Sequence, residues 1–293
     1  MSDLLVSICC TTYNHKRYIS QAIEGFLMQR TSFSIEIIIH DDASTDGTTE
    51  IVKAYADQYP HRIIPIFQKE NQWSQGKRPS PNYVLPKARG KYIALCEGDD
   101  YWTDPLKLQR QIDFLEANID YSLCFHNAKV IYEDTRTKSH DFTKLKKNDF
   151  YIEDIISNNW FIPTQSIVFR RQQLEIPNWY NYIFGGDLAL LLILATKGKI
   201  YGINEVMSIY RINNGSVSSN LPVNYTSLKK IETLSFFNLH TNFIYNSLIQ
   251  KAITEINKSL YFNMFFSRPL YIRILSFDYY AFKLKELLGR QKN

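Results

Sequence analysis

Carboxylates are concentrated at the point where one apolar segment ends. The run Glu97-Gly98-Asp99-Asp100 follows residues 92–96, which are predicted to form a buried strand. Carboxylates so close together repel one another and resist burial, so a fold keeps them together most readily around a cation or a polyhydroxyl ligand. A divalent metal that carries a diphosphate is the natural occupant. The alternative is a solvated turn, after which Asp104-Pro105 caps the helix that begins near Leu106.

A second polar cluster follows the apolar run 35–40. It reads Asp41-Asp42-Ala43-Ser44-Thr45-Asp46-Gly47-Thr48. Asp46 and Thr48 suit a helix cap and Gly47 suits a turn, which leaves Asp41 and Asp42 surplus to that need. The first apolar run, 5–10, likewise ends in polar groups, namely Thr11, Thr12, Tyr13 and Asn14. Because open α/β sheets bind ligands at the carboxyl ends of their strands, three strand ends are predicted to converge on one polar rim that can accept hydrogen bonds from a ribose or a base.

The elements that must position these residues alternate along the first 130 residues. Apolar residues recur at helical spacing within 19–27, 51–59 and 108–115, between the strand-like runs. This βαβ rhythm predicts an α/β fold with a mostly parallel sheet covered by helices. With 293 residues the chain can bury a full core, and we expect a catalytic domain over residues 1–220 and a helical, aromatic-rich C-terminal extension over 221–293.

Four ordered motifs resemble the inverting glycosyltransferases of family 2, which have the nucleotide-diphospho-sugar transferase fold called GT-A. The resemblance covers roughly residues 4 to 217. The motifs are Thr11-Thr12-Tyr13-Asn14, residues 41–48 as given above, Ala94-Leu95-Cys96-Glu97-Gly98-Asp99-Asp100, and Gly186-Asp187-Leu188-Ala189-Leu190-Leu191. The resemblance implies a Rossmann-like GT-A domain, a UDP-linked nucleotide-diphospho-sugar donor, and a divalent metal, Mn²⁺ or Mg²⁺.

The resemblance also implies roles for single residues. Asp187 matches the catalytic base, and Asp99 matches the principal metal ligand, assisted by Glu97 or Asp100. The nucleotide would lie across the first two strand ends, and Arg211 would donate to the leaving phosphates. The residues expected to contact the nucleotide sugar are Thr11, Tyr13, Asn14, Asp41, Asp42, Asp99 and Arg211.

Three positions depart from the family pattern. Gly186 stands where relatives carry the first member of an acidic pair, Asn213 where many carry a His that can face the metal or diphosphate, and Glu97 where Asp is common. A base role needs one carboxylate, so Gly186 leaves the assignment of Asp187 standing. Asp187 has a second interpretation, because an acidic residue at a helix start also favours the helix through capping and the helix dipole.

The expected activity is transfer of a hexosyl or N-acetylhexosaminyl group, with inversion, to a glycan or lipid-linked acceptor in bacterial surface polysaccharide or glycolipid synthesis. A nicotinamide dehydrogenase would need a Gly-rich phosphate turn after the first strand, where Thr11-Thr12-Tyr13-Asn14 stands. A sugar nucleotidyltransferase normally opens with a Gly- and Arg-rich loop, which is missing. A catalytically inactive relative that binds sugar nucleotides is the remaining alternative, and metal-dependent turnover would distinguish it.

Composition sets further bounds. The formal net charge of +5 suits an anionic ligand or membrane, but no basic stripe or known module indicates nucleic acid binding. Four cysteines lie in apolar runs without metal-ligand spacing, which predicts reduced thiols. Without a secretion signal or an apolar run of membrane-spanning length, we expect a cytoplasmic protein, with a peripheral position at the inner face of the membrane as one option.

Four other segments carry weaker signals. Residues 158–164 are aromatic and polar and suit the holding of a sugar ring, whereas residues 133–148 read as a lysine-rich surface excursion with no assigned chemistry. In the polar loop 69–86, Asn71, Lys77 and Arg78 either reach the diphosphate or form an exposed basic loop. The aromatic run 261–271 predicts an interfacial helix at a bilayer, or equally packing onto the catalytic domain or into a homo-oligomer interface.

Overall fold

The computed structural model describes residues 4–134, 137–158, 160–183, 185–213 and 224–266, with the backbone alone for 262–266. Of the aromatic run 261–271, residues 267–271 lie outside the described residues. The chain divides into two compact units, residues 1–221 and 222–293, and each is described by itself.

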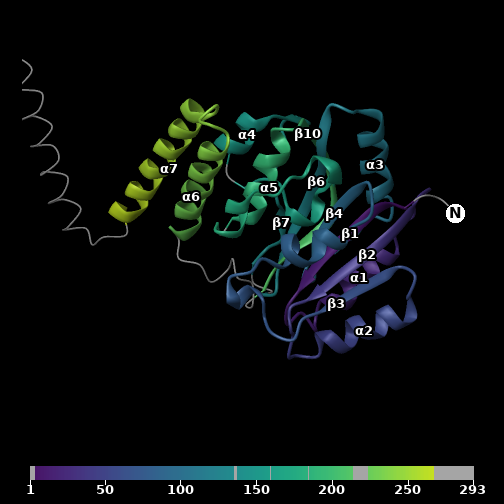
Figure 1. Cartoon of the computed structure of the whole chain (residues 1–293). Helices are drawn as coiled ribbons and strands as arrows, with labels where there is room; N and C mark the ends of the chain where they lie inside the picture. The colour runs from purple at the N-terminus through teal and green to yellow at the C-terminus, as the bar shows by residue number, and fades with distance from the viewer. Residues whose placement is uncertain (1–3, 135–136, 159, 184, 214–223, 267–293) are drawn as a thin grey trace, which may run out of the picture. The chain divides into compact units, whose positions relative to one another are not determined.

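Ten strands among the described residues form one sheet in the first unit (Figure 1). Their order is β3-β2-β1-β4-β9-β6-β10-β5, with β7 paired to β6 and β8 paired to β10. The strands are β1 (Leu4–Thr12), β2 (Ser34–Asp41), β3 (Ile63–Phe67), β4 (Tyr92–Glu97), β5 (Tyr101–Trp102), β6 (Tyr121–Tyr132), β7 (His140–Asp141), β8 (Asp149–Phe150), β9 (Val168–Arg170) and β10 (Lys199–Ile212). Strands β3, β2, β1 and β4 are parallel, as are β6 and β10, while β9 runs antiparallel between β4 and β6. The predicted α/β fold with a mostly parallel sheet is therefore confirmed.

Helices alternate with the strands in the first unit. In the second unit the described regular elements are helices. They are α1 (Ile19–Leu27), α2 (Thr48–Gln58), α3 (Lys107–Ala117), α4 (Ile152–Ser157), α5 (Gly186–Ala195), α6 (Tyr225–His240) and α7 (Asn246–Phe266). A short turn precedes β9. Ser166 Oγ donates to Pro163 O at 2.6 Å and closes a 3₁₀ turn, Thr164–Ser166, directly before β9.

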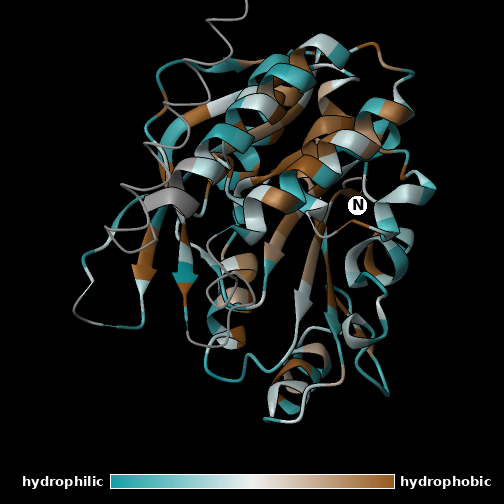
Figure 2. Cartoon of the chain, turned by 90° about the vertical axis from the view of Figure 1, so that its left-hand side faces the viewer, coloured by the Kyte–Doolittle hydropathy of each residue, from teal (hydrophilic) through white to brown (hydrophobic). Residues whose placement is uncertain are grey.

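One hydrophobic cluster of the first unit lies on the sheet face that α1, α2 and α3 cover. Alternate residues of β1 point into it, so Val6, Ile8 and Cys10 are buried with Phe26 of α1 and Leu108 of α3. Figure 2 shows hydrophobic residues concentrated along the central strands, with hydrophilic residues on the surrounding loops. The parallel strands thus share one apolar face and end at a common edge of the sheet.

A buried tryptophan anchors the segment directly after the acidic run. Trp102 is 1% exposed, its ring meets the Phe26 ring edge-on at 4.9 Å, and its indole N–H donates to Gln165 O at 2.8 Å. The Nζ of the fully buried Lys107 lies 3.8 Å from the Trp102 ring centroid. Burial lowers the pKa of Lys107 to about 7. These contacts fix the position of the chain two residues beyond Asp100.

A buried carboxylate joins β1 and β2 to the segment that leads into β4. Glu36, which is 2% exposed, accepts hydrogen bonds from Ser7 Oγ at 2.6 Å and from the Arg89 backbone N–H and Nε, both at 2.8 Å. Burial by itself raises the pKa of Glu36, but the hydrogen bonds from Ser7 and Arg89 outweigh it, so the pKa is lowered. The ionised form of Glu36 therefore stabilises the fold.

Glu36→Gln should lower the free energy of unfolding near neutral pH by about 1–3 kcal/mol, because the amide replaces an ionised acceptor of charge-assisted hydrogen bonds. Since the folded state lowers this pKa, the contribution is present above the unfolded-state pKa and is lost as pH falls through the folded-state value. Urea unfolding of both proteins from pH 7 down to about pH 2.5, well below the ordinary Glu pKa of 4.5, measures the difference. A difference that stays constant across this range would contradict the assignment.

The second unit contains α6 and α7, which pair as a helical hairpin. The rings of Phe237 and Tyr245 stack with centroids 5.7 Å apart, and Asn238 Nδ2 donates to Asn246 Oδ1 at 2.9 Å. Within the part of the chain that the structure describes, no helix is long and apolar enough to cross a membrane.

Candidate functional site

The ends of β1, β2 and β4 are joined to one another by hydrogen bonds. The Gly98 N–H donates to Thr11 O at 2.9 Å, and the Asp42 N–H donates to Thr12 O at 3.0 Å. Asn14 joins the loops after β1 and β2, because its Oδ1 accepts from the Thr45 N–H at 2.9 Å. The structure therefore brings together the three polar strand ends that were identified in the sequence.

Asp41 and Asp42, which the predicted helix cap does not need, each have structural partners. Asp41 is 1% exposed and accepts hydrogen bonds from Ser44 and Thr49. Asp42 is 3% exposed, and its two oxygens accept from the backbone N–H groups of Gln72 at 2.8 Å and Trp73 at 3.0 Å. Asp42 thus fixes the loop 69–86 beside the sheet edge, and a carboxylate with two accepted bonds retains capacity for more.

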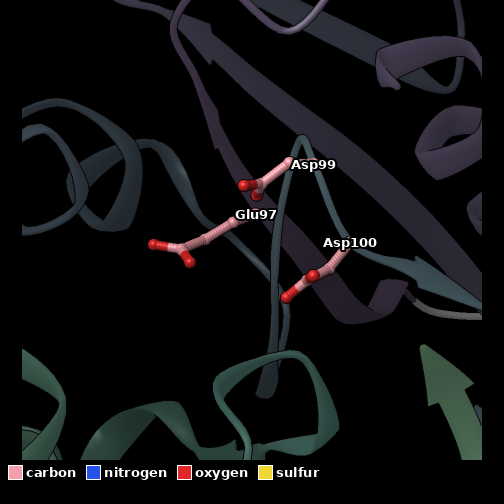
Figure 3. Close-up of side chains that lie close together, drawn as sticks. All are labelled: Glu97, Asp99 and Asp100. Atoms are coloured by element: carbon pink, nitrogen blue, oxygen red, sulfur yellow. The ribbon is translucent and has the colours of Figure 1, made fainter. Parts of the chain in front are cut away.

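The acidic run forms a compact cluster of oxygens. One carboxylate oxygen from each of Glu97, Asp99 and Asp100 lies within 4.8 Å of the other two. Figure 3 shows the three side chains around the turn, with those of Glu97 and Asp99 directed to the same side. Asp100 is 1% exposed, and burial, followed by the charge of Asp99, raises its pKa well above the ordinary value. Oxygen-only ligands of this kind suit a hard divalent cation such as Mg²⁺ or Mn²⁺.

Arg211 supports this turn through both its backbone and its side chain. Its N–H donates to Asp100 Oδ1 at 2.7 Å, its Nη1 donates to Asp99 O, and its Nη2 donates to Gln21 Oε1 at 2.8 Å. The guanidinium also lies 4.6 Å from the Tyr18 ring centroid and 5.1 Å from that of Tyr101. The sequence indicated a phosphate contact for Arg211 and gave no sign of this supporting position.

Two further residues contact the turn. Asn213 Nδ2 donates to Asp99 Oδ2 at 3.1 Å, so the residue that replaces the usual His still orients Asp99. His15, which was not predicted to be a site residue, has its Nε2 3.8 Å from the same oxygen. A Cβ at Gly98 would lie 2.6 Å from Thr12 Oγ1 and 3.0 Å from His15 Nδ1, which explains the glycine within the acidic run. The signal for His15 was its place directly after Tyr13-Asn14.

Asp187 lies in the first turn of α5, whose start has no side-chain capping hydrogen bond. Its Oδ2 accepts a hydrogen bond from Thr164 Oγ1 at 2.9 Å. Burial raises the pKa of Asp187, while the Thr164 hydrogen bond and the Arg78 charge partly offset the rise. Desolvation of the Glu97 carboxyl, followed by the charges of Asp187 and Asp99, raises the pKa of Glu97 to about 8. Asp187 and the acidic run therefore share one electrostatic environment.

Two side chains lie against Gly186. Tyr180 OH donates to Gly186 O at 2.9 Å, and a Cβ at Gly186 would lie 2.9 Å from Arg78 Nη1. The Arg78 guanidinium lies 5.8 Å from the Tyr180 ring centroid. Arg78 therefore occupies the space beside Gly186 and brings a positive charge from the loop 69–86 to the start of α5.

The sequence matches the profile of the family described as Glycosyl transferase family 2 over residues 7–176. The chain belongs to this family. Glucosyltransferase WfaP of Escherichia coli, whose name gives UDP-Glc and α-D-GlcNAc-diphosphoundecaprenol, is 33% identical over 228 residues, which cover 74% of this chain and 80% of WfaP. Protein Rv1520 of Mycobacterium tuberculosis is 40% identical over 218 residues, which cover 70% of this chain. The chain spans only 58% of the length of Rv1520.

A solved structure of S. aureus TarS residues 1–349 in complex with UDP-GlcNAc has the same fold. It superposes with a TM-score of 0.60 at 17% sequence identity and covers 80% of this chain and 66% of the TarS chain. At this identity the likeness concerns the fold alone. The predicted GT-A fold and family 2 membership are both confirmed.

Arg211→Lys should lower the free energy of unfolding by about 1–3 kcal/mol, although it keeps the charge. The reason is that one ammonium group cannot reproduce a planar fork that binds Asp99 O and Gln21 together and stacks between two rings. Chemical denaturation of Arg211→Lys and Arg211→Met measures this. If lysine restores the wild-type stability while methionine does not, charge and not fork geometry supports the turn.

Proposed function

We propose that the chain transfers a sugar from a UDP-linked donor to an acceptor hydroxyl, with inversion at the anomeric carbon, in synthesis of a bacterial surface polysaccharide or glycolipid. The observation that carries this proposal is the cluster of carboxylate oxygens from Glu97, Asp99 and Asp100, at the edge where the ends of β1, β2 and β4 meet. The donor and the lipid-linked acceptor named for WfaP support this choice of substrates. On this proposal the enzyme works at the cytoplasmic face of the membrane.

The chemical step needs one base and one leaving group. Asp187 accepts the proton of the acceptor hydroxyl as that oxygen forms a bond to the anomeric carbon of the donor. The bond between the anomeric carbon and the diphosphate oxygen breaks on the opposite face, so the nucleoside diphosphate leaves with the bonding electrons and the configuration inverts. No covalent enzyme intermediate is needed.

Donor binding is assigned to the joined strand ends. Thr11 near the end of β1, Tyr13 and Asn14 after it, Asp41 as the last residue of β2 and Asp42 after it lie on the side of β4 where the nucleotide would bind. The carboxylates of Asp99, Glu97 and Asp100 would hold a divalent metal ion, Mn²⁺ or Mg²⁺. When bound, such an ion supplies positive charge that stabilises the departing diphosphate.

The direct test is nucleoside diphosphate release from a panel of nucleotide sugars, with and without chelator. We expect release from a UDP-sugar that increases with a saccharide acceptor and stops in chelator. A chain that binds UDP-sugars by calorimetry but releases no UDP with any acceptor would be the inactive relative, and the proposed function would be wrong.

Asp99→Asn should weaken binding of Mn²⁺ in the presence of UDP by at least about tenfold, because a neutral amide oxygen replaces the ionised ligand. The amide can still accept the hydrogen bond from Asn213, so the turn is preserved. Electron paramagnetic resonance of Mn²⁺ measures the affinity independently of turnover. Asp57→Asn, on the exposed face of α2, is the matched control and should bind Mn²⁺ as the wild type does. Equal affinity in Asp99→Asn would remove Asp99 from the metal site.

Asp187→Asn should leave UDP-sugar affinity unchanged and lower the transfer rate by roughly 10² to 10⁴, because the amide cannot accept the acceptor's proton. Asn retains much of the capping ability of Asp, so the melting temperature should change little. Affinity, melting temperature and initial rate are measured on one preparation. A variant that loses melting temperature but keeps its turnover would show a structural role for Asp187.

A further inference from the structure

Three aromatic side chains from distant segments form a rigid corner in the first unit. Phe142 follows β7, Trp160 precedes the turn Thr164–Ser166, and Tyr210 lies in β10. The ring centroids are 5.1 Å apart for Phe142 and Trp160, 5.4 Å for Phe142 and Tyr210, and 5.7 Å for Trp160 and Tyr210, and each pair of planes is 88–89° apart. Trp160 remains 49% exposed within this aromatic corner. Edge-to-face packing therefore holds the indole in one orientation while half of its surface meets solvent.

The aromatic corner is connected to the acidic run through β10. Arg211, the residue after Tyr210, donates its backbone N–H to Asp100 Oδ1 at 2.7 Å. Side chains alternate along a strand, so Tyr210 projects from the sheet face opposite to the one on which Arg211 meets Gln21. The aromatic corner and the acidic run thus lie at the same end of β10 and on different faces of it.

The aromatic corner is also connected to Asp187. Thr164, which donates to Asp187 Oδ2, comes four residues after Trp160. Four residues of extended chain span at most about 14 Å, so the Trp160 backbone lies within that distance of the Thr164 backbone. This is within the reach of a short oligosaccharide.

The strand order separates the aromatic corner from the nucleotide side. The ends of β1 and β2 lie on one side of β4, whereas β6 and β10 lie on the other side of it (Figure 1). Phe142 joins this second side, because its N–H donates to Ala128 O of β6 at 2.7 Å. A donor across β1 and β2 would therefore leave the β6 and β10 side to the second substrate.

We propose that the aromatic corner is a subsite for the glycan acceptor, in which the exposed face of the Trp160 indole stacks on a pyranose ring next to the ring whose hydroxyl reaches Asp187. This inference rests on the proposed function. Rings with equatorial substituents, as in β-linked glucose or N-acetylglucosamine, present a flat apolar face of axial C–H groups that matches an indole. Because Phe142 and Tyr210 already fix the indole, little side-chain freedom is lost on binding.

Saturation-transfer difference NMR with defined saccharides tests the subsite without turnover. The probes are cellobiose, N,N′-diacetylchitobiose and methyl β-glucoside, each titrated with and without UDP. The proteins are the wild type, Trp160→Ala, Trp160→Phe and the control Phe67→Ala, which removes a similarly exposed aromatic (41%) at the far strand β3. Thermal unfolding of each variant shows whether it is folded.

Binding of a disaccharide should weaken at least about tenfold in Trp160→Ala, stay within a few-fold in Trp160→Phe, and stay unchanged in Phe67→Ala, with equal UDP affinity throughout. Saturation should transfer most strongly to the axial ring hydrogens. Equal disaccharide affinity in the wild type and Trp160→Ala, or a wild type that binds UDP but none of the probes, would overturn the subsite. Failure of the wild type to bind UDP while disaccharides still need Trp160 would instead refute the proposed function.

Discussion

Four carboxylates, those of Glu97, Asp99, Asp100 and Asp187, share one edge of the sheet, and burial followed by the charges of neighbouring carboxylates raises the pKa of Glu97 and of Asp100. The surrounding fold keeps them together with positive charge and directed donors. Arg211 binds both aspartates of the turn, and Arg78 brings a charge close to Asp187. Upstream, the Gly98 N–H bonds to Thr11 O, and downstream, Trp102 is buried in the core. On the proposed function, these contacts would hold the carboxylates in position for a cation and an anionic diphosphate.

The departures from the family pattern are accommodated by neighbouring residues. Gly186 replaces an acidic residue, and Arg78 packs into the space that a side chain at this position would need. Asn213 replaces a His, yet it still donates to Asp99 and brings no charge of its own. The carboxylates of Asp99 and Asp187, on which the proposed function depends, are present despite both departures.

The fold and the acidic residues were predictable from the sequence because strand periodicity and strand-end polarity are local signals. Apolar runs ending in Thr11, Asp41 and Glu97 mark the edge at which parallel strands meet. The partners of Asp42 and Arg211 were not predictable, since Gln72 and Trp73 lie about thirty residues from Asp42 and Asp99 lies 112 residues from Arg211. The aromatic corner was not predictable for the same reason, because its three residues lie far apart in the sequence. Residues 158–164 carried a sugar-binding signal, but Phe142 lies in a segment read as surface loop and reaches Trp160 only through the β6–β7 pairing.

The central claim is that Asp187 is the base, with a pKa that burial raises and that the hydrogen bond from Thr164 partly restores. The most direct measurement is the pH dependence of the transfer rate for the wild type, Thr164→Val and Thr164→Ser. The Thr164 hydrogen bond lowers the pKa of Asp187, and the base must be ionised to act, so the rate rises as pH increases through that pKa. Valine keeps the shape of threonine and removes the donor, so the acidic limb should move to higher pH, whereas serine keeps the donor and should preserve the wild-type profile. An acidic limb that is unchanged in Thr164→Val would contradict the assignment of Asp187 as the base.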